Sequence, residues 1–323
     1  MIVSKTPYRI PLSGGGTDID FYYKKFGSRF SSVCISEYVY VYMVTRKLDD
    51  NYMIQTSKVE FPQKINQINH KLIRETIKFF KIKEKLQIST FSSVPTSTGL
   101  GTSSALVIGL IKCILEYKKI KLSQSQIFKI AYHIERKTCR YAGGWQDQIA
   151  SEFGGFIDVE ISKKEKIKIF KKKNIKNIQK IVNKHFLLVY SKKKRDSSLI
   201  IKSQMKNLKK TYAYYNEIKK LNNPIIKSIN DVNIKKLGKL FSYHWNLKKC
   251  LTKNISNKKL DNLYSEIMSL ANVLGGKLIG AGGGGFFLIV VKNKKDILSS
   301  LTKKNLNYVD LKFENNGSLM VKI

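Results

Sequence analysis

Residues 95–105 read Pro95-Thr96-Ser97-Thr98-Gly99-Leu100-Gly101-Thr102-Ser103-Ser104-Ala105, and they run without a break into the apolar segment 106–115. The first part is small, hydroxylic and glycine-rich, whereas the second is apolar on nearly every face, which predicts a buried helix entered through a flexible loop. Such a loop suits an anion, because glycines allow close approach and the first turn of a helix presents unpaired N–H groups. The stretch therefore predicts a phosphate-binding loop. An ordinary capped core helix stays open as the alternative.

The hydroxyls that follow the glycines have several possible uses. Thr102, Ser103 and Ser104 can cap the helix, bind phosphate oxygen or ligate a magnesium ion. The loop is not a Walker loop, because no Gly-Lys-Ser/Thr follows the glycines. It is not a dinucleotide-binding fingerprint either, because the Gly-x-Gly-x-x-Gly spacing is absent.

Two other glycine-rich segments accompany this loop. One is Arg9-Ile10-Pro11-Leu12-Ser13-Gly14-Gly15-Gly16-Thr17-Asp18, and the other is Gly280-Ala281-Gly282-Gly283-Gly284-Gly285-Phe286. Taken in chain order, residues 9–18, 95–105 and 280–286 resemble the three motifs of the GHMP kinase superfamily. The opening segment and Ala142-Gly143-Gly144-Trp145-Gln146-Asp147-Gln148 most resemble the bacterial D-glycero-D-manno-heptose 7-phosphate kinases. Because the motifs extend from residue 9 to residue 286, the resemblance covers the whole chain.

The resemblance implies an α+β fold of two domains with the active site in the cleft between them. Residues 1–180 are expected to form the ATP-binding and catalytic domain, and residues 181–323 the C-terminal domain. A chain of 323 residues is long enough for two domains, and a hydrophobic content of 42% supports a core in each. Four consecutive glycines before the apolar residues 286–291 predict a loop that presses against another loop or a ligand.

The implied reaction is ATP-dependent phosphorylation of the anomeric hydroxyl of a heptose 7-phosphate, which yields the 1,7-bisphosphate. In this scheme Asp147 accepts or orients the proton of the attacking hydroxyl, and Arg9 offsets charge on the transferred phosphoryl group. Other sugar 1-kinases of the superfamily, fucokinase-like or N-acetylhexosamine-kinase-like, are the alternative within the family. A basic nucleic-acid-binding protein with a kinase-like fold is the alternative from another class.

Glu135 precedes Asp147 by 12 positions, which matches the interval between the magnesium-binding glutamate and the catalytic aspartate of galactokinase-like enzymes. The resemblance therefore implies that Glu135 and Ser104 hold Mg²⁺ as a cofactor beside ATP. Without the family context, a single glutamate on a helix is more typical of solvated surface.

The expected ATP contacts lie in the central loop. They are Pro95, Thr98, Gly99, Leu100, Gly101, Thr102, Ser103 and Ser104. The expected sugar contacts lie in the other motifs. They are Arg9, Ser13, Gly14, Gly15, Gly16, Asp18, Gln148, Gly282 and Gly283. Galactokinases carry Glu-His where this chain has Gly15-Gly16, so its sugar recognition must differ. Residues 14–18 also suit a plain turn followed by a helix cap.

A phosphorylated sugar needs a second anion site. The candidates are Lys193, Arg195, Ser197 and Ser198, at the start of a helix expected to continue through residue 220. Basic groups and hydroxyls at the amino terminus of a helix bind phosphate well. A plain basic surface turn is the alternative.

The chain is strongly basic. Lys and Arg number 60 against 23 for Asp and Glu, a formal net charge of +37. Such a charge points to a polyanionic partner. The lysines are spread along the chain, however, and no nucleic-acid-binding signature accompanies them. We therefore expect small-molecule partners, ATP and a sugar phosphate, and no nucleic acid.

The four cysteines and the apolar runs bear on location. Cys34, Cys113, Cys139 and Cys250 form no Cys-x-x-Cys pair, which favours reduced thiols in the cytoplasm. The amino terminus lacks the apolar region of a secretory signal, and no run approaches 18 apolar residues, so no membrane association is expected. The oligomeric state stays open, with a homodimer as one option.

Overall fold

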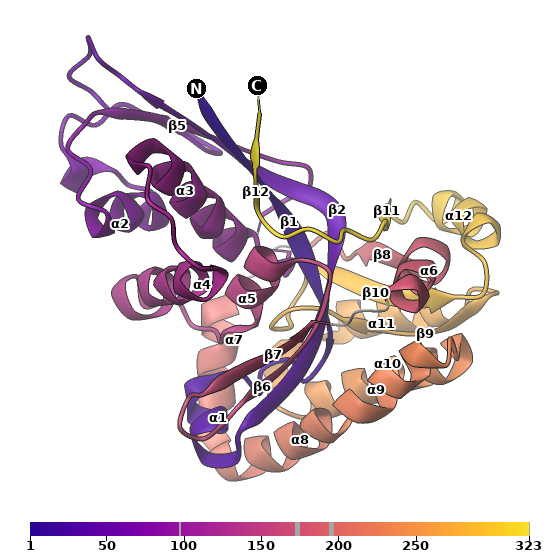
Figure 1. Cartoon of the computed structure of the whole chain (residues 1–323). Helices are drawn as coiled ribbons and strands as arrows, with labels where there is room; N and C mark the ends of the chain where they lie inside the picture. Colours follow the sequence, from indigo (N-terminus) through magenta and orange to yellow (C-terminus); the bar gives the residue numbers. More distant parts are fainter. Residues whose placement is uncertain (97, 172–174, 194–196, 323) are drawn as a thin grey trace.

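The computed structural model describes residues 1–96, 98–171, 175–193 and 197–322. Within these ranges the chain forms an eight-stranded sheet and a four-stranded sheet, each with helices packed against it (Figure 1). The larger sheet runs β12-β1-β2-β5-β3-β4, with β6 and β7 joined through β2, and the smaller runs β11-β8-β10-β9. The α+β fold in two domains that the sequence predicts is confirmed.

The strands have the following bounds: β1 (Ile2–Ser13), β2 (Ser28–Thr45), β3 (Met53–Gln55), β4 (Val59–Glu60), β5 (Leu86–Ser92), β6 (Phe156–Ile161), β7 (Ile167–Lys171), β8 (Phe186–Tyr190), β9 (Val273–Leu278), β10 (Phe286–Val291), β11 (Tyr308–Asp310) and β12 (Leu319–Val321). The α-helices are α1 (Asp20–Phe26), α2 (Lys71–Phe79), α3 (Thr102–Lys118), α4 (Gln124–Tyr132), α5 (Gln146–Phe153), α6 (Lys176–His185), α7 (Ser197–Gln204), α8 (Leu208–Lys220), α9 (Asn222–Asn230), α10 (Ile234–Lys249), α11 (Lys258–Met268) and α12 (Lys294–Lys303). A π-helical turn covers His133–Thr138.

Helix α3 is the buried helix that the glycine-rich loop predicts. Its residues from Ser104 to Ile111 are all buried, and it lies directly on β1, where the Ser4 hydroxyl donates to the Gly109 carbonyl at 2.9 Å. A Cβ on Gly109 would crowd that hydroxyl, so glycine lets the helix approach the sheet closely. Gly101 precedes the helix with φ +85°, a left-handed conformation that favours glycine.

Strand β1 pairs with β2 along most of its length and with β12 at residues 3–5. Pro7 and Pro11 predict that residues 1–12 form an edge strand. This prediction is wrong for residues 3–5, which lie between β2 and β12. The prolines are accommodated because the β12 pairing ends before Pro7 and the β2 register shifts after Pro7 and after Pro11. Figure 1 shows the two termini side by side at this end of the sheet.

Three other expectations differ from the structure. The alternating Val and Tyr of residues 38–42 and the turn residues Asp49-Asp50-Asn51 predict a hairpin between residues 32–45 and 52–56, but β5 pairs with β2, and β3 lies beyond β5 and parallel to it. The helix expected to continue from residue 197 through 220 is interrupted at Met205–Asn207 by a 3₁₀ turn. Apolar residues at helical spacing from Leu260 to Leu274 predict a helix ended by Gly275-Gly276, but α11 stops at Met268 and Gly275 lies in β9. A Cβ on Gly275 would overlap the Gly238 carbonyl, so glycine admits α10 against this strand.

An aromatic cluster joins the two domains through α1 and α8. Phe21, Tyr22 and Phe26 meet Tyr212 and Tyr215, with ring centroids 5.4 Å apart for Tyr22 and Tyr215. Rings at such separations contribute packing energy beyond simple burial.

In the described parts of the chain, no helix is both long and apolar enough to cross a bilayer.

Candidate active site

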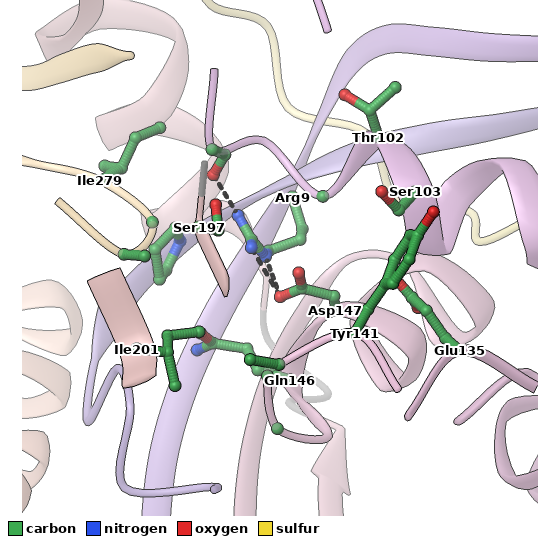
Figure 2. A pocket seen from close by; sticks show the side chains of 18 of the residues that line it. Arg9, Thr102, Ser103, Glu135, Tyr141, Gln146, Asp147, Ser197, Ile201 and Ile279 are labelled. Carbon is green, nitrogen blue, oxygen red and sulfur yellow. Dashed lines mark hydrogen bonds and ion pairs between the residues drawn. The ribbon is translucent and has the colours of Figure 1, made fainter. Parts of the chain in front are cut away.

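A cavity of about 960 Å³ lies where the two domains meet, and both domains line it. The first domain contributes the ends of β1 and α3 and the segment 141–147, and the second contributes α7, α10 and the residues after β9. Figure 2 shows Arg9 and Asp147 between Thr102, Ser103 and Glu135 on one side and Ile279, Ser197 and Ile201 on the other.

Arg9 and Asp147 form an ion pair in this cavity. Arg9 leaves β1 and is 4% exposed, while Asp147 lies in the first turn of α5. The Arg9 Nε and Nη2 atoms both donate to Asp147 Oδ1, at 2.8 and 2.5 Å, and Nη1 donates to the Gly99 carbonyl at 2.7 Å. The arginine therefore joins the glycine-rich loop of residues 95–101 to the carboxylate (Figure 2). We call this predicted phosphate-binding loop the phosphate loop.

Ser104 and Glu135, the predicted magnesium ligands, lie in contact. The Ser104 hydroxyl donates to Glu135 Oε2 at 2.6 Å, and Glu135 is 2% exposed. The π-helical turn places Glu135 at the cavity wall, where Arg136 Nη1 lies 3.3 Å from its Oε1. Burial of a glutamate with such partners rules out the solvated-surface alternative.

A magnesium ion at a nucleotide normally takes one or two carboxylates together with phosphate oxygens and water, not a full protein cage. The described residues contain no group of three or more His, Cys, Asp or Glu side chains that could hold a metal on their own. Glu135 lines the cavity, and the Ser104 hydroxyl lies buried behind it and bonds to its carboxylate, so one carboxylate with an adjoining hydroxyl is what the protein offers a nucleotide-borne ion. The residues present therefore fit Mg²⁺ carried by ATP.

The phosphate loop is shaped by its glycines and by a second loop. Gly99 and Gly101 have φ of +92° and +85°, and they line the cavity with Pro95, Thr102 and Ser103. Thr98, Leu100 and Ser104 are buried beneath the loop and do not line the cavity. A Cβ on Gly285 would overlap the Thr98 carbonyl, so the glycine segment 280–285 does press against another loop, as its composition predicts.

Asp18 lines the cavity and is 4% exposed. Its Oδ2 accepts from the backbone N–H of Gln146 at 2.8 Å, which ties it to the start of α5. Burial raises the pKa of Asp18 above its usual range. Gly144 runs so close that a Cβ there would overlap this carboxylate. Gly15 and Gly16 also line the cavity, and a Cβ on Gly16 would collide with Tyr215 of the second domain.

Several predicted sugar contacts lie behind the cavity wall. Gln148 is fully buried, and its Nε2 donates to Glu135 Oε2 at 2.5 Å. Ser13 bonds to Ser31 at 2.7 Å and to Asn222, and neither Ser13 nor Gly14 lines the cavity. Gly282 and Gly283 pack against Ile255. The structure therefore gives Gln148 a role in holding Glu135, where the sequence predicts a direct sugar contact.

The predicted second anion site is only partly at the cavity. Ser197 and Ser198 line it, and the Ser198 hydroxyl accepts from the Ala142 N–H at 3.3 Å. The Lys193 side chain is exposed and does not line the cavity, although its carbonyl accepts from the Gly285 N–H at 2.9 Å. Arg195 lies outside the described residues.

Sequence reasoning missed three basic residues at the second-domain wall. His244 and Lys248 come from α10, and Lys277 comes from β9, and all three line the cavity. Lys277 is 2% exposed, which is rare for a lysine. A signal was present, because Lys277 stands in the otherwise apolar and glycine-containing stretch 273–279. Gln146, also missed, lines the cavity with a buried Nε2 that has no partner in the described structure.

Known proteins that resemble this chain show the family to which it belongs. The N-terminal domain model of the GHMP kinases matches residues 69–155, and the C-terminal model matches residues 225–306. The chain belongs to the GHMP kinases. As such it is a phosphotransferase that takes a phosphoryl group from ATP to an alcohol group of a small molecule.

This GHMP kinase is similar to the D-glycero-alpha-D-manno-heptose 7-phosphate kinase of Campylobacter jejuni. The two are 29% identical over 300 residues, which cover 87% of this chain and 86% of the relative. It is 28% identical to the mevalonate kinase of Methanocaldococcus jannaschii over 75% of each chain. The crystal structure of a D-glycero-D-manno-heptose 1-phosphate kinase from Bacteroides thetaiotaomicron has a TM-score of 0.82 and 22% identity, and the match covers 100% of this chain and 99% of that one. At that identity the likeness concerns the fold.

Proposed function

We propose that this GHMP kinase phosphorylates the anomeric hydroxyl of D-glycero-D-manno-heptose 7-phosphate, as a step in the synthesis of nucleotide-activated heptose for surface polysaccharide. The product is the 1,7-bisphosphate. The observation that carries the proposal is the Arg9–Asp147 pair, which lies between the phosphate loop and the second-domain wall. The similarity to the Campylobacter jejuni heptose 7-phosphate kinase supports the choice of sugar.

The roles of the site residues follow from their contacts. Arg9 occupies Asp147 Oδ1, so Oδ2 is the oxygen that accepts or orients the proton of the sugar hydroxyl. The same guanidinium, close to the Gly99 carbonyl, offsets charge on the phosphoryl group as it transfers. Phosphoryl transfer passes through a loose transition state, so positioning and charge supply most of the rate.

The phosphate loop holds the nucleotide. Thr102 and Ser103 begin α3 and line the cavity, and the N–H groups and hydroxyls of this first turn bind the triphosphate. Ser104 and Glu135 would hold Mg²⁺, which would supply positive charge to offset that of the phosphates. Beyond the loop the cavity is lined by apolar side chains, among them Val39, Leu72 and Phe91, and this end accepts the adenine base.

The test is an ADP-release assay with a panel of acceptors. The panel holds D-glycero-D-manno-heptose 7-phosphate, the same heptose without phosphate, fucose, an N-acetylhexosamine and mevalonate. The expected result is the highest kcat/KM for the heptose 7-phosphate, with a new anomeric phosphate in the ³¹P spectrum of the product. A preference for an unphosphorylated sugar would move the assignment to a fucokinase-like or N-acetylhexosamine-kinase-like activity. Absence of ADP release with every acceptor, together with specific RNA binding, would reject the kinase.

A further inference from the structure

Three buried basic side chains meet at the second-domain wall of the cavity. His244 and Lys248 lie one turn apart on α10, and Lys277 reaches them from β9. Lys277 Nζ donates to the Leu12 carbonyl at 2.6 Å and lies 3.1 Å from His244 Nδ1. Lys248 Nζ donates to the Gly280 carbonyl. We refer to His244, Lys248 and Lys277 as the basic cluster.

The basic cluster brings three basic side chains together where water has little access. Exposed fractions are 3% for His244, 9% for Lys248 and 2% for Lys277. In the ranges that the structure describes, neither His244 nor Lys277 has a carboxylate within ion-pair distance. Burial lowers the pKa of Lys277 well below its usual range, and the neighbouring Lys248 lowers it further. Burying a lysine without an anionic partner is unfavourable, so the presence of Lys277 here indicates a functional role.

His244 adds a buried ring nitrogen whose hydrogen-bonding capacity is unused. An anion bound in the cavity would keep Lys277 protonated, so that its Nζ donates to His244 Nδ1 and the imidazole proton lies on Nε2. That Nε2 atom has no partner among the residues described. Buried donors are nearly always paired, and an unpaired one loses the hydrogen bonds that water would have given it. An anion in the cavity is the partner that would use this N–H and both lysines at once.

The basic cluster lies at the opposite end of the acceptor site from ATP. The Arg9 backbone N–H donates to Leu100 in the phosphate loop, whereas Leu12, which contacts Lys277, comes three residues later on β1. Three residues of a strand span about 10 Å. An acceptor whose reacting hydroxyl sits at Asp147 therefore extends away from the nucleotide toward the basic cluster. The nucleotide phosphates bind at the start of α3 and do not account for these cations.

We propose that His244, Lys248 and Lys277 bind the phosphate at the far end of the acceptor sugar. This inference rests on the proposed function, because it assumes a phosphorylated acceptor. It places the second anion site on α10 and β9. The sequence predicts this site within residues 193–198 instead, but Lys193 does not line the cavity.

The test compares two acceptors in four variants. Lys277→Met, Lys248→Met and His244→Leu each remove one group of the basic cluster, and Lys239→Met removes an exposed lysine from the same helix. KM and kcat are measured for the heptose 7-phosphate, for the unphosphorylated heptose and for ATP. Each basic-cluster variant is expected to raise KM for the heptose 7-phosphate about 10–100-fold, the range for a charge-assisted hydrogen bond. KM for the free heptose and for ATP stays unchanged, and Lys239→Met behaves as wild type.

A binding measurement separates a lost contact from a damaged fold. Titration calorimetry with inorganic phosphate, in the presence of a saturating non-hydrolysable ATP analogue, reports the second anion site without catalysis. Phosphate binding is expected in the wild type and is absent in Lys277→Met. The thermal midpoint of Lys277→Met is expected to equal or exceed that of the wild type, because an apolar side chain replaces a buried basic group that has no anionic partner in the described residues.

The outcomes distinguish the inference from the proposed function. A wild type that prefers the free heptose would overturn both. A wild type that prefers the heptose 7-phosphate, with basic-cluster variants that keep its KM, would overturn the inference alone. If Arg195→Ala raises KM for the heptose 7-phosphate while the basic-cluster variants do not, the second anion site lies in residues 193–198 instead.

Discussion

Arg9 places two of its nitrogens on a single oxygen of Asp147. The Nε and Nη2 atoms lie 2.8 and 2.5 Å from Oδ1, and no hydrogen bond from the described residues reaches Oδ2. The pair is 5% exposed on the arginine side and 25% on the aspartate side, so the carboxylate opens toward the cavity. One oxygen is thereby fixed by the protein, and the other is the one that we propose meets the acceptor.

The first prediction concerns this aspartate. Asp147→Asn keeps an acceptor oxygen for Arg9 but removes the charge and the proton acceptor. Turnover should fall about 10²–10⁴-fold, as expected when a positioned acid–base group is lost. Steady-state ADP release measures the effect, and circular dichroism checks the fold. The exposed Asp296→Asn on α12 is the control. Turnover within a few-fold of wild type would mean that Asp147 has another role.

Glu135→Gln should weaken the use of magnesium, because a neutral amide is a poorer ligand for a hard cation than a carboxylate. The amide can still accept from Ser104, so the local hydrogen bond survives. We expect the variant to need a higher magnesium concentration for ADP release. Saturating magnesium should restore only part of the wild-type activity. Glu116→Gln, an exposed change on α3, should leave the titration in place. If both variants titrate like wild type, Glu135 is not a metal ligand.

The loop hydroxyls should differ in importance. Ser104 is buried and bonded to Glu135, whereas Thr102 is only half-buried at the cavity wall. Ser104→Ala should reduce kcat/KM for ATP about 10–100-fold, the effect of losing a hydrogen bond to a charged group. Thr102→Ala should cost less. Kinetics at fixed sugar and varied ATP decide the order, and the reverse order would show that the loop binds the nucleotide in a different register.

Gly285→Ala tests the contact between the two glycine-rich loops. Gly285 has φ +100°, and a Cβ there would overlap the Thr98 carbonyl, so the loops must separate. The free energy of unfolding should fall by about 1–3 kcal/mol, and KM for ATP should rise because Thr98 precedes Gly99 of the phosphate loop. Gly15→Ala is the matched control for stability, since a Cβ at Gly15 meets no atom. Equal urea midpoints for the two variants would contradict the packing described.

A further prediction concerns the buried Glu152, whose Oε1 lies 2.8 Å from Lys112 Nζ. Burial raises the pKa of Glu152 to about 7 from its usual 4.5. The folded protein therefore keeps a proton that the unfolded chain releases between pH 4.5 and 7. This group's contribution to the free energy of unfolding must then fall as the pH rises through that window, by about 3 kcal/mol.

Glu152→Gln removes that titration. Urea unfolding at pH 5 and pH 8 should show a smaller loss of stability with rising pH in the variant than in the wild type. Glu116→Gln supplies the comparison for an exposed acid on the neighbouring helix. Identical pH dependence in wild type and Glu152→Gln would place the pKa of Glu152 near its ordinary value.

Much of the site could be predicted because its signals are local. A run of glycines and hydroxyls before an apolar segment specifies a loop and a buried helix, and the structure has both. Gln148 shows where local reasoning stops. It follows Asp147 in sequence, but successive residues of a helix point about 100° apart. Asp147 therefore faces the cavity while Gln148 faces Glu135 in the core.

The basic cluster could not be predicted from the sequence for a different reason. His244 and Lys277 are 33 residues apart and meet only because glycine lets α10 lie against β9. A single buried lysine in a strand is a signal that something binds it, but the partner depends on tertiary packing. The same holds for the β2–β5 pairing, since nothing local decides which strand lies beside β2.

The pairing of β12 with β1 has a consequence for biosynthesis. Residues 319–321 complete the sheet at residues 3–5, the Ser318 hydroxyl bonds to that of Thr6 at 2.7 Å, and Arg9 lies further along the same strand. At the usual speed of translation, roughly 15–60 s separate the appearance of these two segments. Throughout that interval this edge of β1 is open on the ribosome, and a nascent chain with an open strand edge is a substrate for chaperones. Arg9 therefore gains its finished surroundings only after the second domain has been made.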